Sequence, residues 1–112
     1  MKLPQDTTII ASEKLRDYAL NDLSPDGTSK AHYLADIGYE QDTWRQLEHD
    51  LRTQHLSLEC QPGRPSRYGR KYEICAPLRG PNGQQRWLRT VWMIRHGETS
   101  ARLITLIPEK HP

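Results

Sequence analysis

Residues 82–95, with the sequence NGQQRWLRTVWMIR, contain the strongest fold signal of this chain. Asn82-Gly83 is typical of a two-residue hairpin turn, because both residue types tolerate the positive φ angles that such turns require. The segment Gln85–Arg95 that follows is rich in aromatic and β-branched residues and predicts a long strand. Before the turn, Arg70 to Pro77 predicts the antiparallel partner of that strand.

Further strands are predicted on both sides of this hairpin. A turn at His96-Gly97-Glu98 leads into a strand from Arg102 to Pro108. Leu56–Cys60 alternates apolar and polar residues and predicts a short strand, whereas Gln61–Arg67 contains two prolines and predicts a loop. We therefore expect an antiparallel sheet of three to four strands in the second half of the chain.

The first half of the chain has helical periodicity, with Ser12 and Thr28 or Ser29 as predicted N-caps and Gly38 as a predicted helix end. The predicted helices span about Ser12–Leu20, Thr28–Ile37 and Gln41–Gln54, and the predicted loop spans Asn21–Gly27. The expected fold is thus α+β, with about three N-terminal helices packed on the C-terminal sheet. The 112 residues suit a single domain, residues 1–112.

The charge is unevenly distributed along the chain. Residues 1–56 contain six Lys/Arg and ten Asp/Glu, whereas residues 57–112 contain ten Lys/Arg and four Asp/Glu. A basic second half suggests an anionic partner, and the alternative is that the two halves neutralise each other.

No apolar run is long enough to span a membrane and the start lacks an apolar leader, so we expect a cytoplasmic protein. Cys75 is expected to be buried, and a disulfide with Cys60 is not favoured in that compartment.

Alternation along Gln85–Arg95 separates two faces of the predicted sheet. The even positions are mostly apolar and are expected to face the helices, whereas the odd positions mix aromatic, apolar and arginine side chains and suit a half-exposed surface or groove. The even set is Arg86, Leu88, Thr90, Trp92 and Ile94, and the odd set is Trp87, Arg89, Val91, Met93 and Arg95. Cations and aromatics on a sheet suit RNA recognition, and the alternative is a solvated basic face.

Tyr68-Gly69-Arg70-Lys71-Tyr72 is the densest polar-aromatic cluster. A phenol and an ammonium group there could bind phosphate or transfer a proton; alternatively Tyr72 belongs to the core and the two cations face solvent. Lys30 and His32 lie at the start of the second helix, where anions are favoured, although His32 also fits a plain surface position. The sequence contains no HExxH, CxxC, GxGxxG or Walker motif, so we expect no metal and no cofactor.

Several short motifs follow one another in a familiar order. They are Lys14-Leu15-x-x-Tyr18-x-Leu20, Pro25–Ala31, Gly38-Tyr39 before Trp44, Tyr68–Tyr72, Pro77–Gly83, Thr90–Trp92 and Arg102–Thr105. Over nearly the whole chain this order resembles a bacterial family, the domain of unknown function 6883. Members look like small stand-alone proteins and C-terminal modules of polymorphic toxins. Their layout is similar to that of the barnase–EndoU–colicin–RelE group of toxin ribonucleases.

The resemblance implies a site on the sheet and the adjoining helix. Its candidate residues are Lys30, Tyr68, Lys71, Thr90, Arg102 and Thr105. In the catalytic roles, Lys30 and Lys71 would bind phosphate, Tyr68 would assist proton transfer and Arg102 would stabilise developing charge. Substrate contacts are expected from Arg70, Arg89, Thr90 and Thr105. His32 departs from the residue types expected in relatives at its position, which leaves no obvious histidine base.

The leading hypothesis is a metal-independent, RNA-cleaving toxin domain that a small antitoxin- or immunity-like protein neutralises. RNA contributes its own nucleophile, the 2′-hydroxyl, so such a domain needs no catalytic Ser or Cys. The alternative is a non-catalytic module that uses the sheet face or edge to bind a protein partner or a second copy of itself. A third hypothesis is RNA binding without cleavage, with steep salt dependence.

Overall fold

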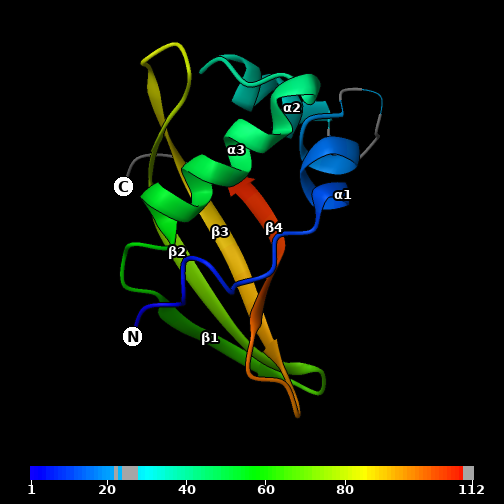
Figure 1. Ribbon diagram of the computed structural model, residues 1–112, viewed down its shortest axis with the longest axis vertical. Helices are drawn as coiled ribbons and strands as arrows, with labels where there is room; N and C mark the ends of the chain where they lie inside the picture. Colours follow the sequence, from blue (N-terminus) through cyan, green and yellow to red (C-terminus); the bar gives the residue numbers. More distant parts are fainter. Residues whose placement is uncertain (22, 24–27, 110–112) are drawn as a thin grey trace.

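The computed structural model describes residues 1–21, 23 and 28–109. In this part of the chain, helical segments come first and a four-stranded antiparallel sheet with the order β1-β2-β3-β4 follows (Figure 1). The helical segments are α1 (Ser12–Lys14), η1 (Leu15–Ala19), α2 (Thr28–Ala35), η2 (Gln41–Thr43), α3 (Trp44–Asp50) and η3 (Leu51–His55). The strands are β1 (Gln61–Ser66), β2 (Gly69–Arg79), β3 (Gln85–Arg95) and β4 (Ala101–Pro108). The predicted α+β class is confirmed.

The hairpin of β2 and β3 is the centre of the sheet. Its register is unbroken from Gly69 opposite Arg95 to Arg79 opposite Gln85. β3 begins and ends at the predicted residues, and the turn before it contains Gly83 at a φ of 86°. The register of β4 against β3 shifts between Val91 and Trp92. This bulge adds one residue to β4 and bends that strand locally.

The predictions for residues 56–66 were wrong in both parts. Gln61–Ser66 is strand β1, whereas Leu56–Cys60 forms no strand and connects η3 to β1. Prolines are compatible with β1 because it lies at the edge of the sheet, and its register shifts between Pro62 and Pro65.

The three predicted helices are present, with local differences. The first has no side-chain cap: its N-cap is Ala11 instead of Ser12, and residues 15–19 adopt π-helical winding. The third is a continuous run of η2, α3 and η3. Gly38 lies in the turn after α2 at a φ of 104°. Most of the predicted loop, residues 22 and 24–27, and the side chains of residues 28 and 29 lie outside the described part.

The helices pack against one face of the sheet. Leu88, Thr90 and Trp92 are buried there, as their even positions predicted, while Arg86 is exposed near the start of β3. Gln54 of η3 fastens this layer to β2, because its side-chain amide donates to the carbonyl of Arg79 and accepts from the Arg79 amide. Figure 1 shows α3 lying across this face.

We call the opposite face, which bears Lys71, Glu73, Arg89 and Arg102, the open face. The odd positions Val91 and Met93 are buried at its centre, although they were predicted to be half-exposed. Met93 lies between Lys71 and Arg102 in the register, and Val91 lies between Glu73 and Thr105. We attribute their burial to the longer neighbouring side chains, which can fold over them.

The cysteines differ from the prediction. Cys75 is exposed on the open face, because residues two apart on a strand point to the same side and Cys75 is two residues from Glu73. The neighbouring Ile74 points to the other face and is buried. Cys60 is the buried cysteine. Among the described residues, no helix is long and apolar enough to cross a membrane.

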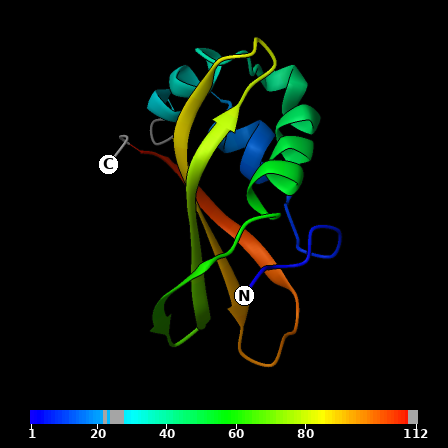
Figure 2. The same cartoon turned by 90° about the vertical axis from the view of Figure 1, so that its left-hand side faces the viewer.

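The lower half of the sheet extends beyond the helices. Both views show the β1–β2 turn and the β3–β4 turn at this same end of the molecule (Figures 1 and 2). The His96 amide donates to the carbonyl of Tyr68 at 3.0 Å, so the two turns contact each other directly.

Candidate functional site

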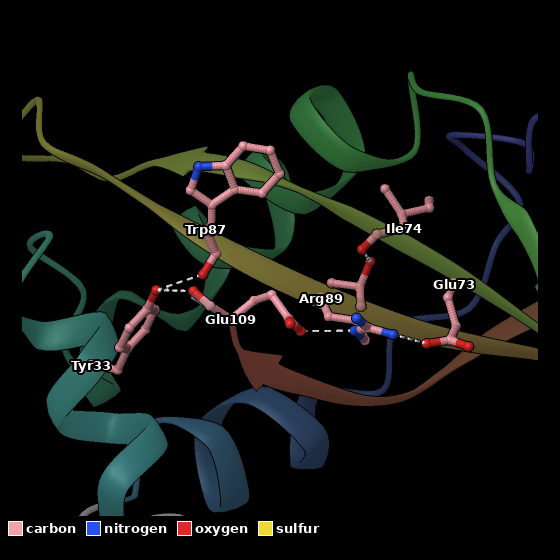
Figure 3. A network of polar contacts seen from close by, with 7 residues as sticks. Tyr33, Glu73, Ile74, Trp87, Arg89 and Glu109 are labelled. Atoms are coloured by element: carbon pink, nitrogen blue, oxygen red, sulfur yellow. Dashed lines mark hydrogen bonds and ion pairs between the residues drawn. The ribbon is translucent and has the colours of Figure 1, made fainter. Parts of the chain in front are cut away.

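An arginine between two carboxylates lies near the middle of the open face (Figure 3). From β3, the Arg89 guanidinium reaches Glu73 of β2 at 2.7 Å and Glu109, just after β4, at 2.8 Å. Glu109 is fixed in turn, because the hydroxyl of Tyr33 in α2 donates to its backbone carbonyl at 3.2 Å and also to that of Trp87. Three strands and α2 therefore determine the geometry of this cluster.

This cluster combines charge with access to solvent. About a third of each side chain is exposed: 37% for Arg89, 35% for Glu73 and 27% for Glu109. Hydrogen bonds to Glu109 and then Glu73 raise the pKa of Arg89 above its usual value, so the guanidinium is a permanent cation. A fixed carboxylate beside a fixed guanidinium can accept a proton while the guanidinium binds an anion.

Two further cations lie in the row of the open face next to that of Glu73. Lys71 of β2 and Arg102 of β4 both pair in the register with Met93 of β3. Two strand spacings separate their backbones, so their Cα atoms are about 10 Å apart, within reach of one phosphodiester group for side chains of this length. Arg102 also forms an ion pair with Glu98 at 3.0 Å.

Lys30 lies at the β4 edge of the sheet. From α2, its ammonium donates to the hydroxyl of Tyr18 at 2.8 Å and to that of Thr105 at 2.9 Å, and it lies 4.6 Å from the Tyr18 ring centroid. A groove of about 450 Å³ adjoins it, lined by Tyr18, Thr105, Ile104, Glu13 and Lys14. Both hydrogen-bond partners are neutral, so the positive charge of Lys30 is available to an anion.

Tyr68 lies elsewhere, in the turn between β1 and β2, and is 61% exposed. The guanidinium of Arg67 lies 5.1 Å from its ring centroid and donates to its hydroxyl at 3.0 Å. Arg70 is exposed at the start of β2 and pairs with Ile94, on the face opposite Lys71. The four predicted catalytic residues thus occupy three places: Lys71 with Arg102, Lys30 with Thr105, and Tyr68 by itself.

Thr90, which was predicted to contact the substrate, does not lie on the open face. Its side chain is fully buried under the helices, and its hydroxyl accepts from the Trp92 indole at 2.9 Å. The same oxygen lies 2.9 Å from Nδ1 of His55, which is also fully buried. Burial lowers the pKa of His55 to about 4, against a smaller opposing contribution from the backbone of Ala76. Thr90 therefore belongs to a polar contact inside the core.

The sequence reasoning missed Glu73, Glu109 and Tyr18. Glu73 alternates with buried residues on β2, a signal that places it opposite the helices, but only the register shows that it meets Arg89. Among the described residues, no group of three or more His, Cys, Asp or Glu is placed to hold a metal ion. The charged side chains of the open face include Glu73, Lys71, Arg89 and Arg102.

The comparisons with known proteins agree with this fold. One solved structure that resembles the chain is described as a contact-dependent growth inhibition toxin–immunity protein complex from Klebsiella pneumoniae 342. The similarity covers 91% of this chain and 100% of that one, with a TM-score of 0.67 and 15% sequence identity. No curated protein shows significant similarity to the chain. The model of the domain of unknown function DUF6883 matches residues 2–110, and the chain therefore belongs to the DUF6883 family.

Proposed function

We propose that the chain is a toxin-like ribonuclease domain that cleaves RNA on its open face without a metal ion. The observation that carries this proposal is the ion-pair cluster: Arg89 is held between Glu73 and Glu109, and Glu73 lies one row from Lys71 and Arg102. A base and several phosphate-binding cations on one accessible surface are what RNA cleavage by the 2′-hydroxyl needs.

In this proposal Glu73 is the general base. Its carboxylate takes the proton of a ribose 2′-hydroxyl, the O2′–P bond forms and the P–O5′ bond breaks. The leaving O5′ takes a proton from Lys71, which lies two residues from Glu73 on the same face of β2. Arg89 and Arg102 bind the non-bridging oxygens, where negative charge develops. The products are a 2′,3′-cyclic phosphate and a 5′-hydroxyl end.

The resemblance to a chain of a toxin–immunity complex supports a toxin-like or an immunity-like role. Lys30 fits the same scheme at the edge of the face, where it would bind a neighbouring phosphate together with Thr105. The predicted role of Tyr68 in proton transfer is dropped from this scheme, because Tyr68 lies in the turn between β1 and β2, before the first residue of β2.

The test is cleavage of a structured RNA by the purified chain in EDTA. We expect cleavage with cyclic-phosphate ends, and a loss of about 100-fold or more in Glu73→Gln. Asp42→Asn, an exposed carboxylate of η2, is the matched control and should leave the rate unchanged. Intact RNA with the folded wild-type chain, or equal rates for Glu73→Gln and wild type, would overturn the proposal. Far-UV circular dichroism verifies that each variant folds.

A non-catalytic protein-binding module is the second candidate. It rests on the neighbour's origin in a two-protein complex and on the same exposed charges, which suit an acidic partner. This candidate predicts that wild-type chain leaves RNA intact in the assay above.

A further inference from the structure

The end of the sheet away from the helices forms a cationic tip. It comprises the β1–β2 turn, the β3–β4 turn and the adjoining strand ends. Residues 61–71 and 95–102 contain six Lys/Arg and one carboxylate, Glu98, which gives a formal charge of +5. The whole chain has a net charge of only +2, so positive charge is concentrated here. Such concentration favours a polyanionic partner.

Several cations of the tip are available to that partner. Arg64, Arg67, Arg70 and Arg95 are all exposed. Among the described residues, no carboxylate lies within ion-pair distance of Arg64, Arg70 or Arg95. The described carboxylates therefore form no ion pair with these three cations.

An exposed aromatic ring lies among these cations. Tyr68 is 61% exposed and has Arg67 near its ring at 5.1 Å. The ring projects from a braced turn: Ser66 accepts from the Tyr68 amide at 3.1 Å, and the Tyr68 carbonyl accepts from His96. A fixed ring beside guanidinium groups provides a surface on which an unpaired base can stack while the cations bind its phosphates.

We propose that the tip binds a single-stranded segment of RNA, with one base stacked on Tyr68 and flanking phosphates on Arg64, Arg67 and Arg95. This inference rests on the proposed function and adds the substrate class: RNA with an unpaired stretch beside the cleaved bond. Lys71 and Arg102 join the tip to the open face, because both flank Met93 in the register. Bases in a duplex are already stacked and cannot use Tyr68 in this way.

The experiment measures binding without cleavage. The chain with Glu73→Gln is titrated into a fluorescein-labelled 12-nucleotide oligouridine and into a 12-base-pair RNA duplex, and anisotropy is recorded. We expect Tyr68→Ala to raise Kd for oligouridine about fivefold or more and to leave duplex binding unchanged. Tyr68→Phe should retain wild-type affinity, because stacking needs the ring and not the hydroxyl. The matched control Arg45→Ala, on α3, should change neither.

Three results would overturn the inference: Tyr68→Ala binding as tightly as its parent, Tyr68→Phe binding as weakly as Tyr68→Ala, or equal losses for duplex and oligouridine. Replacing Arg64 and Arg67 together should make the salt dependence of oligouridine binding shallower, and an unchanged slope would remove both from the proposed contacts. Because binding is measured without cleavage, a chain that binds through Tyr68 but cleaves nothing contradicts only the proposed function. A chain that cleaves without needing Tyr68 contradicts only this inference.

Discussion

At the scale of single residues, His55 makes the stability of the core depend on pH. Its ring is fully buried beside Thr90, and burial lowers its pKa to about 4 from the usual histidine value of 6.5. The folded state thus binds fewer protons than the unfolded state between these pH values. We expect the free energy of unfolding to be unaffected by His55 above pH 6.5 and to fall by about 3 kcal/mol as the pH decreases to 4.

Urea unfolding at a series of pH values measures this effect. His55→Gln should flatten the pH dependence between 4 and 6.5, whatever its effect on the absolute stability. His49, an exposed histidine of α3, provides the matched control, and His49→Gln should keep the wild-type slope. A wild-type slope in His55→Gln would show that other groups cause the pH dependence.

Thr90 and Glu73 show that the alternation of side chains along a strand predicts the face on which a residue lies but not the residue that it contacts. Alternation along β3 placed Thr90 on the helix-packed face, and that is where it lies. Its substrate role came from the resemblance and conflicted with that placement. Glu73 has the parity of the open face, yet its partner belongs to another strand, and only the register of β2 against β3 brings it to Arg89. Contacts between strands depend on register, which local periodicity does not determine.

At the scale of elements, Gly69 allows β2 to begin tightly against β3. A Cβ at this position would lie 2.2 Å from the carbonyl oxygen of Ile94 and 2.7 Å from the Cα of Arg95. These obstacles are backbone atoms, so the strands would have to separate at the tip. We expect Gly69→Ala to lower the free energy of unfolding by about 2 kcal/mol or more and to weaken oligouridine binding.

Gly97→Ala measures the cost of a positive φ without crowding, whereas Gly69, at a φ of 156°, combines a positive φ with crowding. Gly97 lies in the adjoining β3–β4 turn at a φ of 80°, and a Cβ there would meet nothing within 4 Å. Its substitution should cost only the strain of a positive φ, about 1 kcal/mol. Equal losses for the two variants in urea unfolding would contradict the role of close strand approach at Gly69.

The elements that were predicted correctly are those in which the residue types themselves indicate a strand or a turn. β3 has a preceding Asn-Gly turn and dense β-formers, and its bounds were predicted correctly. β1 has no such signal: proline normally indicates a loop, and it is tolerated here because the strand is an edge with a bulge. Edge position is a property of the assembled sheet, so residues 61–66 alone could not predict it.

At the scale of the whole molecule, the helices and the concentrated positive charge lie at opposite ends of the sheet. The helices cover one face of the upper sheet, while the tip with its formal charge of +5 projects beyond them (Figure 2). The remaining residues therefore have a net negative charge. Such a separation directs a polyanion to the tip and the open face and away from the helices.

The packing of helices and sheet around one core predicts that the chain unfolds as one cooperative unit. Leu15 of η1, Leu47 of α3, Trp92 of β3 and Leu106 of β4 belong to one buried cluster, so helices and sheet share a single core. We expect urea unfolding to give one transition, with coincident midpoints for far-UV circular dichroism and tryptophan fluorescence. Fluorescence is a suitable second probe, because Trp92 is fully buried between the layers and loses that environment when they separate. Two resolved midpoints, or a helical signal that persists after the fluorescence change, would contradict a single shared core.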